Sequence, residues 1–170
     1  MNNIKGINPR SVHDFQPFSR DQVWYKENDQ YAIKTDHFIE DWDENKKRLV
    51  LQELRNSIQY GGIVAGSFSE APLIGFASVE GEFFGSNDDY LELSYIHVSN
   101  EYRNKGVGNK LFKMCCAEAK QKGAYKLYIA AHLSIETQHF YISLGCSYVK
   151  EINQNVFERT FRSTNGIHTK

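Results

Sequence analysis

Four residues in the middle of the chain have the types and spacing of a phosphate-binding loop. Arg103 and Lys105 are basic, and Gly106 and Gly108 follow them with one residue in between. Glycine allows consecutive backbone N–H groups to converge on one point, and a helix N-terminus adds about half a positive charge there. Two basic side chains supply further donors for an anion. This arrangement suits the binding of a pyrophosphate.

The two glycines alone are weak evidence, because a glycine at a helix start often makes only a tight turn. The run lacks a third glycine and no acidic residue ends a following strand, which excludes the dinucleotide-binding fingerprint. No Gly-Lys-Ser or Gly-Lys-Thr occurs, which excludes a P-loop. The interpretation therefore depends on the elements that flank the loop.

Those flanking elements are a predicted strand and a predicted helix. Residues 90–98 are rich in β-branched and aromatic side chains, and residues 106–122 predict a helix that ends at Gly123, a usual C-terminal cap. The apolar alternation of the strand changes phase between Tyr95 and Ile96. One extra residue, a β-bulge, does this and leaves backbone groups that a ligand can use. The alternative is a strand that is buried on both faces.

The whole chain predicts a mixed α/β sheet flanked by helices, in a single domain of residues 1–170. Residues 1–44 suggest loops and short elements packed against a core. After them, apolar periodicity and turn residues predict a helix at 45–59, strands at 63–68, 73–80 and 90–98, a helix at 106–122, a strand at 126–130, a helix at 135–144 and a strand at 147–152.

Three segments resemble the GNAT superfamily, the acyl-CoA-dependent N-acetyltransferases. They are the signature Arg103-x-x-Gly106-x-Gly108, the aromatic-Tyr-x-x-Leu-Gly run at 140–146, and a central bulged strand at 91–98. The resemblance implies an α/β (α+β) fold with a mixed, mostly antiparallel sheet flanked by helices. It also implies acetyl-CoA as the co-substrate.

The resemblance further divides the chain into three parts. Residues 61–152 would be the acyl-CoA-binding core, and residues 1–60 would supply elements on the acceptor side. Relatives end in a strand that closes the sheet, whereas residues 162–170 read as polar coil. Residues 153–170 are therefore an atypical tail.

Residues of the donor site are also implied by the resemblance. Backbone groups of Ile96 and Val98 would pair with the pantetheine arm, and N–H groups from Lys105 to Asn109 would hold the pyrophosphate together with the Arg103 side chain. The predicted donor-binding residues are Ile96, His97, Val98, Arg103, Asn104, Lys105, Gly106, Val107, Gly108, Asn109, Ser134 and Tyr141. Ser134 stands where many relatives carry an asparagine.

Glu92 is the predicted general base, because relatives carry a base at this distance before the loop. An amine with a pKa near 10.4 is free in about one molecule per thousand at pH 7.4, a deficit of about 4 kcal/mol. A general base supplies roughly 10²–10⁴-fold, which is enough to offset that deficit. The alternative is a solvated glutamate on a sheet face. His97 is a second candidate base, with a core or edge histidine as its alternative.

Tyr141 is the predicted acid that protonates the leaving CoA thiolate, an uphill transfer of about 2 kcal/mol that a positioned hydrogen bond covers. The alternative is a tyrosine that packs between helix and cofactor. The N–H group of Val98 would stabilise the oxyanion. Attack would be direct, because Cys115 and Cys116 lie in a helix where core packing is the favoured role. No metal is expected, since His132 and His139 lack a third ligand.

The acceptor is expected to be a primary amine of a small molecule or peptide. Trp42 and Asp41 lie in an acidic, aromatic stretch that would attract a cationic amine. The alternative is that these acidic residues only stabilise the start of the following helix. Function is thus predicted as N-acetyl transfer from acetyl-CoA, with a non-catalytic CoA-binding sensor or partner-binding module as the alternative.

Composition excludes several other classes. The formal net charge is −1 and basic residues are not clustered, so no nucleic-acid or membrane partner is expected. No apolar run approaches the roughly 20 residues that span a bilayer. Three cysteines, two of them adjacent, do not suggest a disulfide framework, and the cytoplasm is the expected location. A homodimer is left open.

Overall fold

The computed structural model describes residues 18–27, 30–40, 42–70, 72–149 and 152–164. These residues form two compact units. The first unit comprises residues 18–20 and 37–129, and the second comprises residues 21–36 and 130–164. The expectation that they act as one domain stays a prediction.

The first unit is built on a four-stranded mixed sheet. Its strands are β3 (Ile63–Phe68), β4 (Leu73–Val79), β5 (Tyr90–Val98) and β6 (Lys126–Tyr128), in the order β3-β4-β5-β6. β3 and β4 pair antiparallel, as do β4 and β5, whereas β5 and β6 pair parallel. The predicted mixed, mostly antiparallel sheet is confirmed.

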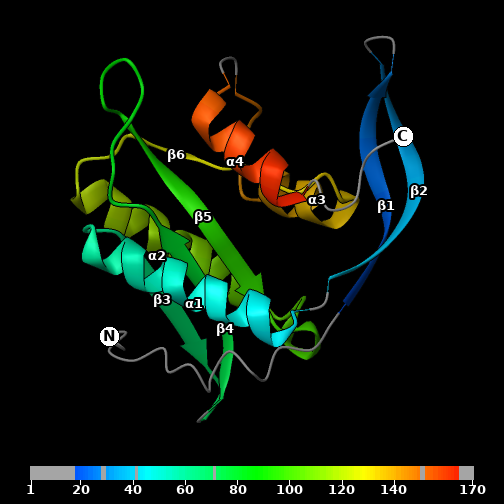
Figure 1. Ribbon diagram of the computed structural model, residues 1–170, viewed down its shortest axis with the longest axis horizontal. Helices are drawn as coiled ribbons and strands as arrows, with labels where there is room; N and C mark the ends of the chain where they lie inside the picture. The colour runs from blue at the N-terminus through cyan, green and yellow to red at the C-terminus, as the bar shows by residue number, and fades with distance from the viewer. Residues whose placement is uncertain (1–17, 28–29, 41, 71, 150–151, 165–170) are drawn as a thin grey trace. The chain divides into compact units, whose positions relative to one another are not determined.

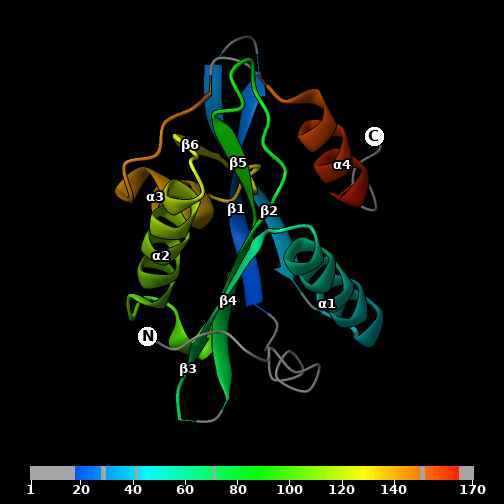
Figure 2. The same cartoon turned by 90° about the vertical axis from the view of Figure 1, so that its left-hand side faces the viewer.

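Two helices cover opposite faces of this sheet (Figure 2), as predicted. They are α1 (Glu44–Gln59) and α2 (Val107–Gln121), and a short 3₁₀ helix, η2 (Asn100–Tyr102), precedes α2. Asp43 caps α1, since its Oδ1 accepts the N–H of Lys46 at 2.7 Å. Figure 1 shows α1 lying along the sheet.

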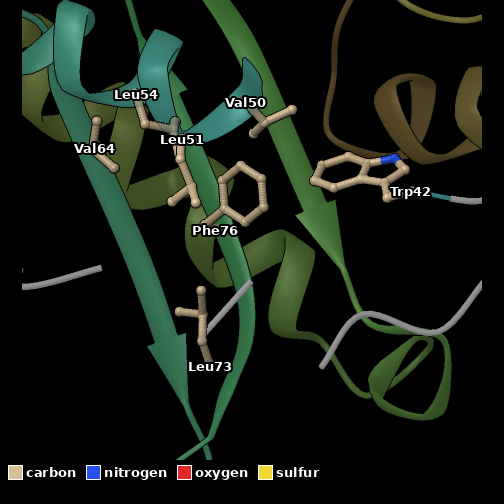
Figure 3. Packing of buried hydrophobic residues seen from close by; sticks show 7 residues of the cluster. All are labelled: Trp42, Val50, Leu51, Leu54, Val64, Leu73 and Phe76. Atoms are coloured by element: carbon tan, nitrogen blue, oxygen red, sulfur yellow. The ribbon is translucent and has the colours of Figure 1, made fainter. Parts of the chain in front are cut away.

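The core under α1 joins helix side chains to the centre of the sheet (Figure 3). Phe76 of β4 is fully buried, and the indole of Trp42 meets it edge-on at 6.0 Å between centroids. The members of this cluster are Trp42, Val50, Leu51, Leu54, Val64, Leu73 and Phe76. Burial of these side chains fixes α1 against β3 and β4.

β5 contains the predicted bulge, one residue earlier than expected. Leu93 pairs with Val79 and Tyr95 pairs with Ser78, so Ser94 is the extra residue. The Ser94 Oγ donates to the Ser78 carbonyl at 3.3 Å. The alternative interpretation, a strand buried on both faces, is also partly right, because the start of β5 is buried on both faces.

The bulge decides which side chains share a face of the sheet. Directly paired residues point the same way. Tyr95 therefore lies with Ser78, whose hydroxyl reaches Ser57 of α1 at 3.2 Å, whereas Leu93 lies with Val79 on the opposite face. Glu92, the neighbour of Leu93, then lies on the α1 face together with Tyr95.

The second unit contains α3 (Ile135–Ser143) and α4 (Gln154–Thr164), together with most of the strand pair β1 (Phe18–Glu27) and β2 (Gln30–Glu40). The expectation of loops and short elements was wrong for residues 18–40. These strands pair with each other, and such pairing between segments does not show in a local pattern.

Two expectations near the C-terminus were wrong. The strand at 147–152 does not form at 147–149 or 152, where Tyr148 and Val149 are exposed instead of packed in a sheet. The polar coil predicted at residues 162–170 is also wrong at 162–164, because α4 extends to Thr164, and residues 165–170 lie outside the described residues. Asn153 begins this helix by accepting the Val156 N–H at 3.1 Å.

Helices long and apolar enough to cross a bilayer do not occur among the residues that the structure describes.

Gly75 permits the close packing of α2 on β4. A Cβ there would meet the His97 carbonyl oxygen at 2.9 Å, and Leu111 and Val107 of α2 at 3.2 and 3.3 Å. We expect Gly75→Ala to lower the free energy of unfolding by about 1–3 kcal/mol in urea titration, because the backbone and the helix must shift. Ala117→Ser on the exposed side of α2 is the control. An unchanged midpoint for Gly75→Ala would contradict the packing described.

Candidate functional site

The loop between β5 and α2 has the backbone geometry of an anion-binding turn. Asn104 has φ of 57° and Gly106, the N-cap of α2, has φ of 80°. Left-handed residues next to right-handed ones turn successive N–H groups toward one point, and the helix dipole adds positive potential. Apart from atoms of the residues next to Gly106 in the chain, no described atom lies within 4 Å of the position that a Cβ on Gly106 would occupy. The geometry fits a bound phosphate.

The basic side chains of the loop have different surroundings. Arg103 is half-buried, and its Nε donates to the carbonyl oxygen of Val98 at 3.0 Å. That bond fastens the loop to the end of β5. Lys105 is exposed, with its ammonium 5.3 Å from the centre of the Tyr102 ring. Arg103 thus positions the loop, while Lys105 supplies a charge near solvent.

The end of β5 has a strand neighbour on one side. β4 pairs with it up to Val98, whereas β6 pairs with it only over Tyr90–Glu92 among the described strands. Ile96, His97 and Val98 lie beyond that short parallel ladder. Their predicted role beside the pantetheine arm stays a prediction, and the Val98 carbonyl already accepts a bond from Arg103.

Glu92 is buried, with 7% of its surface exposed. The alternative of a solvated glutamate is therefore wrong. Its backbone is fixed by the Glu80 N–H, which donates to its carbonyl at 2.8 Å, and by the parallel pairing with Tyr128. Its role as base stays a prediction.

His97 and Trp42 lie in the aromatic core on the α1 face. Their rings are 4.5 Å apart and the His97 ring is 5.8 Å from Phe76, with both residues 8% exposed. This placement matches the alternative of a core histidine. Asp41 lies outside the described residues. Asp43 caps α1, which favours the helix-stabilising interpretation for that acidic residue.

Ser134 and Tyr141 belong to α3 in the second unit. Ser134 is the N-cap and is fully buried, and its Oγ donates to Thr137 Oγ1 at 2.8 Å. Tyr141 is half-buried beside Phe140, at 5.1 Å between ring centroids. Glu92 belongs to the first unit, so the shared action of Glu92 and Tyr141 stays a prediction.

Gln138 is a residue of interest that the sequence did not indicate. It is buried on α3, and both ends of its amide are hydrogen-bonded. The one available signal was its spacing, four residues after Ser134 and three before Tyr141. That signal is weak, because glutamine is common on helix surfaces.

The cysteines show core-like character. Burial, with smaller contributions from Cys116 and Glu118, raises the pKa of the Cys115 thiol to about 12. Burial also raises the pKa of Cys146. A nucleophilic cysteine needs a lowered pKa, so Cys115 is unsuited to an acyl-enzyme route. Within the described residues, no group of three or more His, Cys, Asp or Glu could hold a metal ion.

The sequence matches the Acetyltransferase (GNAT) family over residues 20–146, well over half of the chain. The chain belongs to this family. The resemblance drawn from the loop, the bulged strand and the tyrosine run is therefore confirmed, and so is the enzyme class. Acetyl-CoA is the acetyl donor. No curated protein matches the sequence.

Solved acetyltransferases share the fold at low sequence identity. A Bacillus anthracis str. Ames protein assigned as a streptothricin acetyltransferase, in complex with acetyl coenzyme A, gives a TM-score of 0.59 at 18% identity, over 82% of this chain and 80% of that one. Nourseothricin acetyltransferase gives a TM-score of 0.55 at 16% identity, over 79% of this chain and 75% of that one. AAC(6')-Iy, in complex with the bisubstrate analogue CoA-S-monomethyl-acetylneamine, gives a TM-score of 0.53 at 16% identity, over 65% of this chain and 78% of that one. At these identities the likeness establishes the fold.

The Cys115 thiol should resist alkylation in the folded enzyme. At pH 8 a thiol with a pKa of about 12 holds only about one part in 10⁴ of thiolate, and burial also blocks access. We expect little reaction of Cys115 with iodoacetamide in a Cys116→Ser variant, and normal reaction after unfolding in guanidinium, by peptide mass spectrometry. The half-buried Cys146 is the internal control. Rapid labelling of native Cys115 would contradict its placement.

Proposed function

We propose that this acetyltransferase transfers the acetyl group of acetyl-CoA directly to a primary amine of a basic small molecule. The observation that carries the proposal is the strand–loop–helix at Arg103 to Asn109. Its left-handed residues, the open space around the Cβ position of Gly106 and its basic side chains together fit a diphosphate. The N–H groups from Lys105 to Asn109 then hold the pyrophosphate, and Ile96 and Val98 offer backbone groups to the pantetheine arm.

The reaction needs one proton acceptor and one proton donor. Glu92 accepts a proton from the amine, directly or through a water, as the nitrogen forms its bond to the thioester carbon. The Val98 N–H stabilises the negative charge on the carbonyl oxygen. As the carbon–sulfur bond breaks, Tyr141 gives its hydroxyl proton to the departing thiolate. Solvent then returns a proton to Tyr141 and removes one from Glu92.

A basic acceptor is favoured by the charge of the proposed base. A buried carboxylate at position 92 attracts an ammonium ion. That ion loses one proton to solvent before the attack, and Glu92 takes the second proton as the nitrogen–carbon bond forms. The solved acetyltransferases of this fold named above are described with streptothricin, nourseothricin and an acetylneamine analogue. Those names support testing basic antibiotics first, with a lysine-containing peptide as the contrasting acceptor.

Gly106 and Gly123 form a matched pair for testing the loop. Both have positive φ, 80° and 100°, and a Cβ at either meets no described atom within 4 Å. Alanine at either position should destabilise the fold by about 1–2 kcal/mol through backbone strain. We expect Gly106→Ala alone to weaken CoA binding, by about tenfold in calorimetry, because it distorts the turn that holds the phosphates. Equal CoA affinity in both variants would argue against the loop as the donor site.

Glu92→Gln tests the base. The amide keeps the size of the side chain but loses the ability to take a proton, so kcat/KM should fall about 10²–10⁴-fold while CoA binding is retained. Activity is followed by free-thiol release, with the concentration of the basic amine varied so that kcat/KM is obtained. Glu80→Gln, across the strand pair from Glu92, is the control and should stay near the wild-type rate. A wild-type rate for Glu92→Gln would rule out the proposed base.

A further inference from the structure

α3 carries a buried glutamine between the two residues that the proposed function assigns to it. Gln138 follows Ser134 by four residues and precedes Tyr141 by three, so the three lie along one helix face. Ser134 and Gln138 are buried and Tyr141 is half-buried. Gln138 therefore shares one face of α3 with Ser134 and Tyr141.

Both ends of the Gln138 amide are engaged. Its Nε2 donates to the backbone carbonyl of His132 at 2.8 Å, and its Oε1 accepts the Tyr148 hydroxyl at 3.0 Å. His132 precedes α3, and Tyr148 follows it. One side chain thus ties the segment that enters the helix to the segment that leaves it.

The segments on either side are ordered by further bonds. The Ser134 N–H donates to His132 Nδ1 at 3.0 Å, which sets the turn into the helix. At the other end, the N–H groups of Leu144 and Cys146 both donate to the Tyr141 carbonyl at 3.1 Å. Gln138 lies between these two sets of bonds and is the side chain that links them.

A buried amide holds such a geometry firmly, because separating Gln138 from its partners leaves its own buried polar atoms without hydrogen bonds. Rotation or translation of α3 would break the bond to His132, the bond to Tyr148, or both. The same movement would displace the Tyr141 hydroxyl, one turn further along the face. Misplacement of a reacting group by about 1 Å lowers rates by up to roughly 10²-fold.

We propose that Gln138 is a positioning residue, which fixes α3, and with it the Tyr141 hydroxyl, relative to the segments that enter and leave the helix. The proposal rests on the acid role of Tyr141 in the proposed function. In that step the Tyr141 proton passes to sulfur as the carbon–sulfur bond breaks. Gln138 takes no part in the proton transfer and acts only through the geometry of the helix.

The test is a double-mutant cycle on the single-turnover rate of thiol release, with Gln138→Met and Tyr141→Phe. Methionine keeps the length of the side chain and removes both hydrogen bonds. We expect Gln138→Met alone to lower the rate about tenfold. In the Tyr141→Phe background it should lower the rate no further, because both changes remove the same contribution.

Tyr148→Phe provides a second probe that spares the fold. Tyr148 is 71% exposed as a residue, and the change removes only the hydroxyl that donates a hydrogen bond to Gln138. We expect a loss of about two- to fivefold that disappears in the Tyr141→Phe background. Tyr125→Phe, at a tyrosine 87% exposed in the first unit, is the matched control and should stay within about twofold of wild type.

The outcomes separate this inference from the acid role beneath it. A wild-type rate for Tyr141→Phe would remove the acid role and this inference together. A slow Tyr141→Phe enzyme, combined with unchanged rates for Tyr148→Phe and Gln138→Met, would overturn the positioning role alone. The positioning role would also be overturned if the rate losses of Gln138→Met or Tyr148→Phe multiplied with that of Tyr141→Phe in the double variants. Such losses indicate a structural effect unrelated to Tyr141.

Discussion

The extra residue in β5 is the constraint on which the rest of the first unit depends. Because Ser94 is skipped in the pairing with β4, the strand changes face at that point. Leu93 lies against α2, while Glu92 and Tyr95 both lie on the α1 face. In a regular strand, Glu92 and Tyr95 would lie on opposite faces. The bulge is held by the Ser94 bond to Ser78 and by the Tyr95 hydroxyl, which donates to Glu53 of α1.

The phosphate loop follows β5 directly, so the loop and the proposed base Glu92 are both held by the same strand of the sheet. Arg103 bonds back to the Val98 carbonyl, and the left-handed turn at Asn104 and Gly106 then directs the chain into α2. Gly75 lets the first turns of α2 pack closely on β4. The placement of the loop is therefore set by the sheet, and a rigid support is what pre-organised binding of a diphosphate requires.

Most of the first unit could be predicted from the sequence because its signals are local. Glycines at 106 and 108, the apolar phase change in β5 and the periodicity of α1 and α2 each appear within a short window. The bulge was predicted one residue late, since burial on both faces at Leu91 to Leu93 obscures the alternation. The burial of Glu92 was not predicted, because Glu92 pairs with Tyr128 of a strand distant in sequence, which a local pattern does not show.

The second unit was harder to predict because its structure depends on partners distant in sequence. β1 and β2 are rich in polar residues, and pairing with each other gives them strand structure that no local pattern indicates. Residues 147–149 have strand-like composition but are exposed and unassigned to any strand. The sequence analysis did not predict α4, although Asn153, which caps it, is a residue type that favours helix N-termini. Gln138 became recognisable only through its two hydrogen bonds.

The most direct test of the account is the reaction of the unmodified chain with acetyl-CoA and a panel of amines, in which free thiol and the mass of the acceptor are followed together. The account predicts thiol release that depends on a basic small-molecule amine, with one acetyl group added to that amine for each thiol formed. CoA binding without amine-dependent release across the basic acceptors would contradict it.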